Sequence, residues 1–178
     1  MLAAAPELAR ISLNAPSRAK AEKFFERIMH YAYAGDTALH LAAAAYDVKV
    51  VKALLKRGAR VGARNRRGAE PLHYASDGHA DAPAWNPKAQ AATIALLLEA
   101  GADPNALDKS GVAPLHRAAR TRCSAAVRTL LTGGAKAELS NASGSTARQL
   151  AEKSTGRGGS GSAAAKREQE LILKLLQA

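Results

Sequence analysis

The chain has 178 residues, a formal net charge of +11, 47% hydrophobic residues and only 4% aromatic ones. Its one cysteine, Cys123, excludes an internal disulfide framework, and no run of 18 apolar residues exists that would predict a transmembrane helix. Because alanine supplies much of the apolar content and buries little area, the composition favours thin helical layers over one thick aromatic core.

The two ends of the sequence are basic and the middle is acidic. The net charge is +7 over residues 1–70, −3 over residues 71–112 and +7 over residues 113–178. This uneven charge predicts a patterned surface that would favour an acidic protein, a nucleic acid or an anionic membrane as partner. The alternative is that the charge only keeps a basic protein in solution. The single cysteine fits a reducing compartment, so we expect a cytoplasmic location.

The first expected element is a helix that begins near Ser17, within the stretch 15–34. Its apolar residues recur at helical spacing, which would place them on one face: Phe24, Phe25, Ile28 and Met29. We therefore interpret residues 1–34 as a helical segment that caps the N-terminal end of the array that follows.

Four similar segments come next, and each begins at a glycine: GDTALHLAA at Gly35, GAEPLHYAS at Gly68, GVAPLHRAA at Gly111 and GSTARQLAE at Gly144. Successive copies are 33, 43 and 33 residues apart. A second family of related segments alternates with them: VVKALLKRGARVGARN (50–65), TIALLLEAGADPNALD (93–108) and AVRTLLTGGAKAELSN (126–141). This period indicates repeats that bury their apolar faces against one another.

Each repeat is predicted to contain two helices. Thr37 can cap the first helix of its repeat, and Pro71 and Pro114 stand at the first helical position of theirs. The second helices are each followed by a glycine suited to a left-handed C-terminal cap: Gly58, Gly101 and Gly134.

The helix start T-P-L-H-x-A-A, the 33-residue period and the turn GADPNALD (101–108) resemble the ankyrin repeat over about residues 35–155. The resemblance implies an all-α solenoid of stacked antiparallel helix pairs with short β-hairpin-like turns between repeats. It divides one continuous domain into repeats 35–67, 68–110 and 111–143 and a C-terminal capping repeat, 144–178.

The resemblance also implies roles for repeated residues. It gives His40, His73 and His116 a structural role, bonding the neighbouring hairpin and the helix start. Cys123 occupies a position where the family usually has histidine, and we expect it to be structural too. Tyr46 and Arg122 stand where the family usually has glycine; a left-handed conformation there would cost about 1–2 kcal/mol.

The spacing of 43 residues places a ten-residue insertion in the second repeat, within DGHADAPAWNPKAQ (77–90). It falls between a first helix that ends near Ser76 and a second that begins near residues 88–90, and Pro83 and Pro87 keep either helix from extending through it. Asp77, His79 and Asp81 are potential metal ligands, but three or four ligands must converge to hold an ion, so we expect no metal. Trp85 is interpreted as either a local staple or an exposed anchor for a partner.

The last predicted helix lies in AAAKREQELILKLLQA, with Leu171, Ile172, Leu175 and Leu176 facing inward. The Gly/Ser-rich stretch before it, which includes GRGGSGS, lacks the Gly-Lys-Ser/Thr ending of a phosphate-binding loop, and we interpret it as a flexible linker.

The function expected from these features is a non-enzymatic protein–protein interaction module, a monomer without cofactors that binds an acidic protein or peptide through its concave and hairpin face. Two alternatives remain: polyanion or nucleic-acid binding through the basic surface, and a regulatory subunit or secreted bacterial effector, which would require a different location. The candidate partner-binding residues are Arg64, Arg66, Arg67, Tyr74, Asp77, Trp85, Lys109, Arg117 and Arg120.

Overall fold

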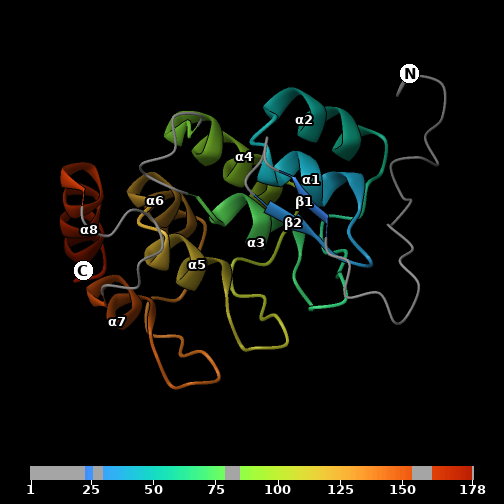
Figure 1. The fold of residues 1–178 in the computed structure, drawn as a ribbon. Helices are drawn as coiled ribbons and strands as arrows, with labels where there is room; N and C mark the ends of the chain where they lie inside the picture. The colour runs from blue at the N-terminus through green and yellow to red at the C-terminus, as the bar shows by residue number, and fades with distance from the viewer. Residues whose placement is uncertain (1–22, 26–29, 79–84, 154–161, 178) are drawn as a thin grey trace.

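The computed structural model describes residues 23–25, 30–78, 85–153 and 162–177. Four antiparallel helix pairs follow one another along the chain (Figure 1). They are α1 (Ala38–Ala44) with α2 (Val48–Lys56), α3 (Pro71–Ser76) with α4 (Pro87–Glu99), α5 (Pro114–Arg120) with α6 (Ser124–Thr132), and α7 (Ala147–Glu152) with α8 (Ala163–Leu175).

The helices form two layers. The first helices of the pairs, α1, α3, α5 and α7, contact one another in order, and the second helices, α2, α4, α6 and α8, do the same. Each layer contributes equivalent leucines to one continuous core. Each of these leucines is at most 2% exposed: Leu39, Leu72 and Leu115 from the first helices, and Leu54, Leu97 and Leu130 from the second. The fold is therefore the predicted all-α solenoid.

The predicted helix boundaries follow from local chemistry. Thr37 is the N-cap of α1, and Pro71 and Pro114 are the first residues of α3 and α5. The helix α3 ends at Ser76 as expected, and α4 begins at Pro87, where the Asn86 side chain accepts hydrogen bonds from the backbone N–H groups of residues 88 and 89.

The left-handed positions are also confirmed. Gly58, Gly101 and Gly134 have φ angles of 77°, 90° and 90° after the second helices. Tyr46 and Arg122 have φ angles of 51° and 59°, so two ordinary side chains stand in a region that strains any residue but glycine.

The predicted N-terminal helix is wrong where the structure describes it. Residues 23–25 and 30–32 form an antiparallel hairpin, β1 (Lys23–Phe25) and β2 (His30–Ala32), with Phe24 opposite Tyr31. Aromatic residues favour strands. The helix was predicted from a few apolar positions, and no other copy of this segment exists in the chain against which that prediction could be checked. Residues 17–22, and Ile28 and Met29 of the expected apolar face, lie outside the described residues.

The helix α8 confirms three of its four expected inward residues. Ile172 is fully buried, Leu176 is 7% exposed and Leu175 is half-buried, but Leu171 is 42% exposed. The buried stripe of α8 runs through Ala165, Ile172 and Leu176 against α6 and α7, so Leu171 lies at its rim. The glycine-rich stretch that was interpreted as a linker falls outside the described residues at 154–161. No helix in the described part of the chain is long and apolar enough to cross a membrane.

Candidate functional site

Three buried histidines tie each first helix to the turn of the next repeat. The backbone N–H at the N-cap of α1, α3 and α5 donates to Nδ1 of His40, His73 and His116, at 3.0, 3.1 and 3.0 Å. On the other side of each ring, Nε2 lies 2.8–3.1 Å from a backbone carbonyl oxygen of the following turn. Because Nδ1 accepts, Nε2 must donate, and each ring is neutral. Burial lowers the pKa of all three histidines, that of His73 to about 4.

A second repeated residue, not predicted from the sequence, shapes the turns. Asn65, Asp108 and Asn141 each accept two backbone N–H groups, from the residues two and four positions later, at 2.8–3.0 Å. Their spacing equals that of the repeat glycines, which was the available signal. The turns are also bonded to one another, for example through the Lys109 N–H to the Arg67 carbonyl at 2.9 Å.

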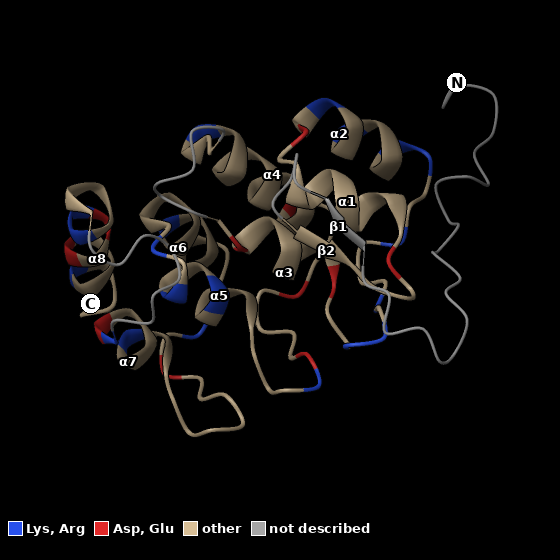
Figure 2. Ribbon diagram, in the orientation of Figure 1, with Lys and Arg blue, Asp and Glu red and all other residues tan. Residues whose placement is uncertain are grey.

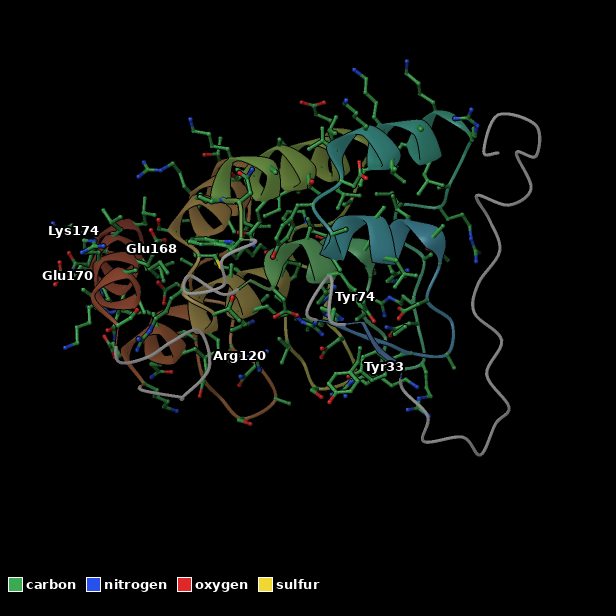
Figure 3. The ribbon with its side chains drawn as sticks, turned by 45° about the horizontal axis from the view of Figure 1, so that its top comes forward. Tyr33, Tyr74, Arg120, Glu168, Glu170 and Lys174 are labelled. Atoms are coloured by element: carbon green, nitrogen blue, oxygen red, sulfur yellow. The ribbon has the colours of Figure 1, made fainter. Side chains whose placement is uncertain are left out.

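The turns and the first helices enclose a hollow of about 490 Å³ on the concave side. Five of the predicted site residues line it: Arg67, Tyr74, Asp77, Arg117 and Arg120. Figure 3 shows Tyr33, Tyr74 and Arg120 on the side of the molecule from which the turns project. Further lining residues come from a segment that was predicted to be helical. They are His30 and Tyr31 of strand β2 and Tyr33, which follows it.

Arg117 is held inside the protein by two carboxylates. Its Nη1 donates to Asp77 Oδ2 at 2.7 Å and its Nη2 donates to Asp108 Oδ2 at 3.0 Å, and only 11% of its side chain is exposed. Burial alone would raise the pKa of Asp77, but Arg117 and then His30 outweigh it and hold that pKa below its usual range. Arg117, one of the predicted partner-binding residues, is therefore largely buried, and these two carboxylates neutralise its charge.

Tyr74 was also predicted to bind a partner, but it is only 1% exposed and therefore offers little surface for contact. Its hydroxyl donates to Asp36 Oδ2 at 2.7 Å and accepts from Asn65 Nδ2 at 2.9 Å. The ring of His30 stacks on it with 4.1 Å between centroids, and His30 Nε2 lies 3.5 Å from Asp77 Oδ2. Strand β2 thus contacts α3 through the ring of His30.

Four of the remaining predicted cations lie on the turns and are exposed, and the fifth, Arg120, ends helix α5. Arg64 donates from Nε to Glu70 at 3.0 Å, and the guanidinium of Arg67 lies 5.0 Å from the centre of the Tyr33 ring. Arg66 and Lys109 are also exposed. Arg120 is 29% exposed and lies 3.8 Å from the Asp77 carboxylate. The accessible positive charge of this face is therefore concentrated at the tips of the turns rather than in the hollow.

Trp85 lies against the apolar core and is half-buried. Its indole N–H donates to Gln90 Oε1 at 2.9 Å, and Gln90 Nε2 donates to the Ala75 carbonyl at 3.0 Å. The nearby Gly78 has no room for a side chain, because a Cβ there would lie 2.7 Å from Cys123 Sγ and 3.1 Å from the Trp85 indole nitrogen. These contacts support the staple interpretation of Trp85 over the anchor.

Substitution of Trp85 by alanine tests the staple. We expect it to lower the free energy of unfolding by about 2 kcal/mol, less than for a fully buried tryptophan. Trp85→Phe is the control: it keeps most of the packing and should cost about 1 kcal/mol for the lost hydrogen bond. Urea denaturation followed by circular dichroism gives both values; unchanged stability in Trp85→Ala would favour the anchor.

Two features of the sequence could have carried chemistry: the Cys123 thiol and the possible metal ligands Asp77, His79 and Asp81. Cys123 is fully buried, and burial raises the pKa of its thiol to about 12, so it stays protonated. His79 and Asp81 lie outside the described residues, and the third member of that trio, Asp77, is bound to Arg117. Within the described ranges, no group of three His, Cys, Asp or Glu side chains is placed to hold a metal ion.

Comparisons with known proteins agree with this geometry. Three family models match the chain: ankyrin repeats (3 copies) over residues 6–83, an ankyrin repeat over residues 67–109 and ankyrin repeats (many copies) over residues 97–151. No curated protein matches it. Stacked helix pairs, histidines that bridge repeats and projecting turns occur across the matched region, and the chain belongs to the ankyrin repeat family.

Proposed function

We propose that this protein binds an acidic segment of a partner protein along the tips of its turns and the mouth of the concave hollow, and that it does so without catalysis. Ankyrin repeats are generally protein–protein interaction modules. The observation that carries the acidic partner is the row of exposed cations on successive turns: Arg64, Arg66, Arg67 and Lys109.

The rigidity of this face supports the proposal. Each turn is bonded internally by Asn65 or Asp108 and to its neighbour through the backbone, so the cations project from a preorganised scaffold. A preorganised surface loses little conformational entropy on binding, which leaves more of the interaction energy as affinity. Aromatic rings at the mouth of the hollow, such as the 47% exposed Tyr31, add the apolar contact that binding sites of this kind use.

The test is charge reversal at the turn of the first repeat. A partner is first captured from the source cell, and its affinity is then measured for the wild type and for the double variant Arg66→Glu/Arg67→Glu. We expect the double variant to bind at least about 10-fold more weakly, while its circular dichroism spectrum stays that of the wild type.

The matched control reverses two exposed cations of the outer helices, Lys88→Glu/Arg128→Glu, which changes the net charge equally. This control is expected to bind the partner nearly as well as the wild type does. Equal losses in both variants would show that net charge, rather than this face, attracts the partner, and normal binding by the turn variant would refute the site.

A further inference from the structure

The outer face of α2, in the first repeat, is basic. The helix α2 buries Val51 and Leu54 completely in the core and exposes Lys49, Lys52 and Lys56 to solvent. Positions three and four residues apart share one side of a helix, so the three ammonium groups form a single stripe. Arg60, just beyond the helix, is exposed as well. Figure 2 shows blue positions, Lys or Arg, along the α2 ribbon.

Among the residues that the structure describes, α2 brings little negative charge to this stripe. The single acidic residue at α2 is its N-cap, Asp47, whose carboxylate accepts the Val50 N–H at 3.0 Å. In the ranges that the structure describes, no ion pair joins Lys49, Lys52 or Lys56 to a carboxylate. The contrast with the hollow is direct, because there Asp77 and Asp108 enclose Arg117.

We infer that this α2 stripe (Lys49, Lys52, Lys56 and Arg60) binds the phosphate backbone of duplex nucleic acid. Exposed lysines that neutralise phosphates release condensed counterions, and this supplies most of the affinity of sequence-independent binding. This surface is separate from the concave face, so the inference goes beyond the proposed function and does not depend on it.

Two features of α2 favour duplex nucleic acid over other polyanions. A helix that lies in the bilayer interface inserts its apolar face, but the apolar face of α2 is already buried against the core, so only charge could attach it to a membrane. Single strands are bound through aromatic side chains on which the bases stack, and the segment 48–60 contains no aromatic residue. Contact with the outside of a duplex requires neither feature.

The experiment measures the anisotropy of a fluorescent 20-base-pair duplex of arbitrary sequence between about 50 and 200 mM NaCl. Four phosphate contacts predict that log K falls with log[salt] with a slope of about −3.6. The triple variant Lys49→Gln/Lys52→Gln/Lys56→Gln should bring the slope to about −1 and weaken binding at 50 mM NaCl by about 10-fold or more.

A matched control removes the same charge from the opposite end of the array. Helix α8 exposes three cations, Lys166, Arg167 and Lys174, which are interspersed with Glu168 and Glu170. Figure 3 labels Lys174 and the two glutamates. The control Lys166→Gln/Arg167→Gln/Lys174→Gln should keep the wild-type slope to within about one unit.

Three results would overturn the inference. Equal losses in the two triple variants would assign the binding to net charge. Absence of duplex binding at 50 mM NaCl would remove the activity. Tighter binding to a 20-nucleotide single strand, or to vesicles of phosphatidylserine and phosphatidylcholine, would assign the stripe to a different polyanion.

Discussion

Replacement of Arg117 by alanine is expected to lower the free energy of unfolding by about 3–5 kcal/mol. The guanidinium is the shared partner of Asp77 and Asp108, whose side chains are 20% and 6% exposed. Without it, among the residues that the structure describes, Asp77 keeps only the longer contacts to His30 and Arg120, and Asp108 keeps only its two backbone donors. The two carboxylates then lie in a mostly buried site where neither can regain full hydration. Small domains are typically stable by about 5–15 kcal/mol, so this one change would remove a large share of the total.

Urea denaturation followed by circular dichroism measures this effect. Arg128→Ala removes an exposed arginine from α6 and is the control, with an expected change below about 0.5 kcal/mol. The double variant Arg117→Ala/Asp77→Asn should recover part of the loss, because it removes one of the two carboxylates that lost the Arg117 guanidinium. If Arg117→Ala unfolds at the urea concentration of the wild type, the two ion pairs do not stabilise the fold.

The features that the sequence predicts well are those that recur. Helix starts, left-handed glycines and bridging histidines each occur in several repeats, so one copy explains another. The left-handed conformations of Tyr46 and Arg122 were predictable for the same reason, since glycine is usual at their positions. Even the insertion could be placed, because α3 and α4 end and begin where the flanking repeats require.

What the sequence does not predict occurs once or joins distant parts of the chain. The hairpin of β1 and β2 has no second copy, so nothing checked its assignment to a helix. The two carboxylates around Arg117 lie far from it in the sequence. Asp77, at the end of α3, is 40 residues away, and Asp108, in the turn before α5, is 9 residues away. Its exposure could not be judged from its own helix, where the repeat pattern places it on the open side. Among the predicted partner-binding residues, four cations are therefore exposed on the turns, while Arg117 is buried and neutralised beneath them.

Acid is expected to destabilise the protein between about pH 6.5 and pH 4 through its buried histidines. Burial, together with Arg117, lowers the pKa of His73 from 6.5 to about 4. As the pH falls through this window the unfolded chain binds a proton that the folded protein cannot, so the equilibrium shifts toward unfolding. A shift of this size corresponds to about 3 kcal/mol from His73 alone, present in full above pH 6.5 and lost by about pH 4. The lowered pKa values of His40 and His116 act in the same direction.

The chain itself supplies the control for this titration. In the last repeat Gln149 occupies the histidine position, and its Oε1 accepts the Thr146 N–H at 2.9 Å, as His73 Nδ1 accepts the Glu70 N–H at 3.1 Å. His73→Gln should therefore keep the helix cap, and it should cost about 1–2 kcal/mol at pH 7.5 because the Val112 carbonyl loses its donor. Since glutamine does not titrate, the variant should lose about 3 kcal/mol less than the wild type between pH 7.5 and pH 4. Urea denaturation at the two pH values measures the difference, and parallel losses in the two proteins would show that His73 is not the group that titrates.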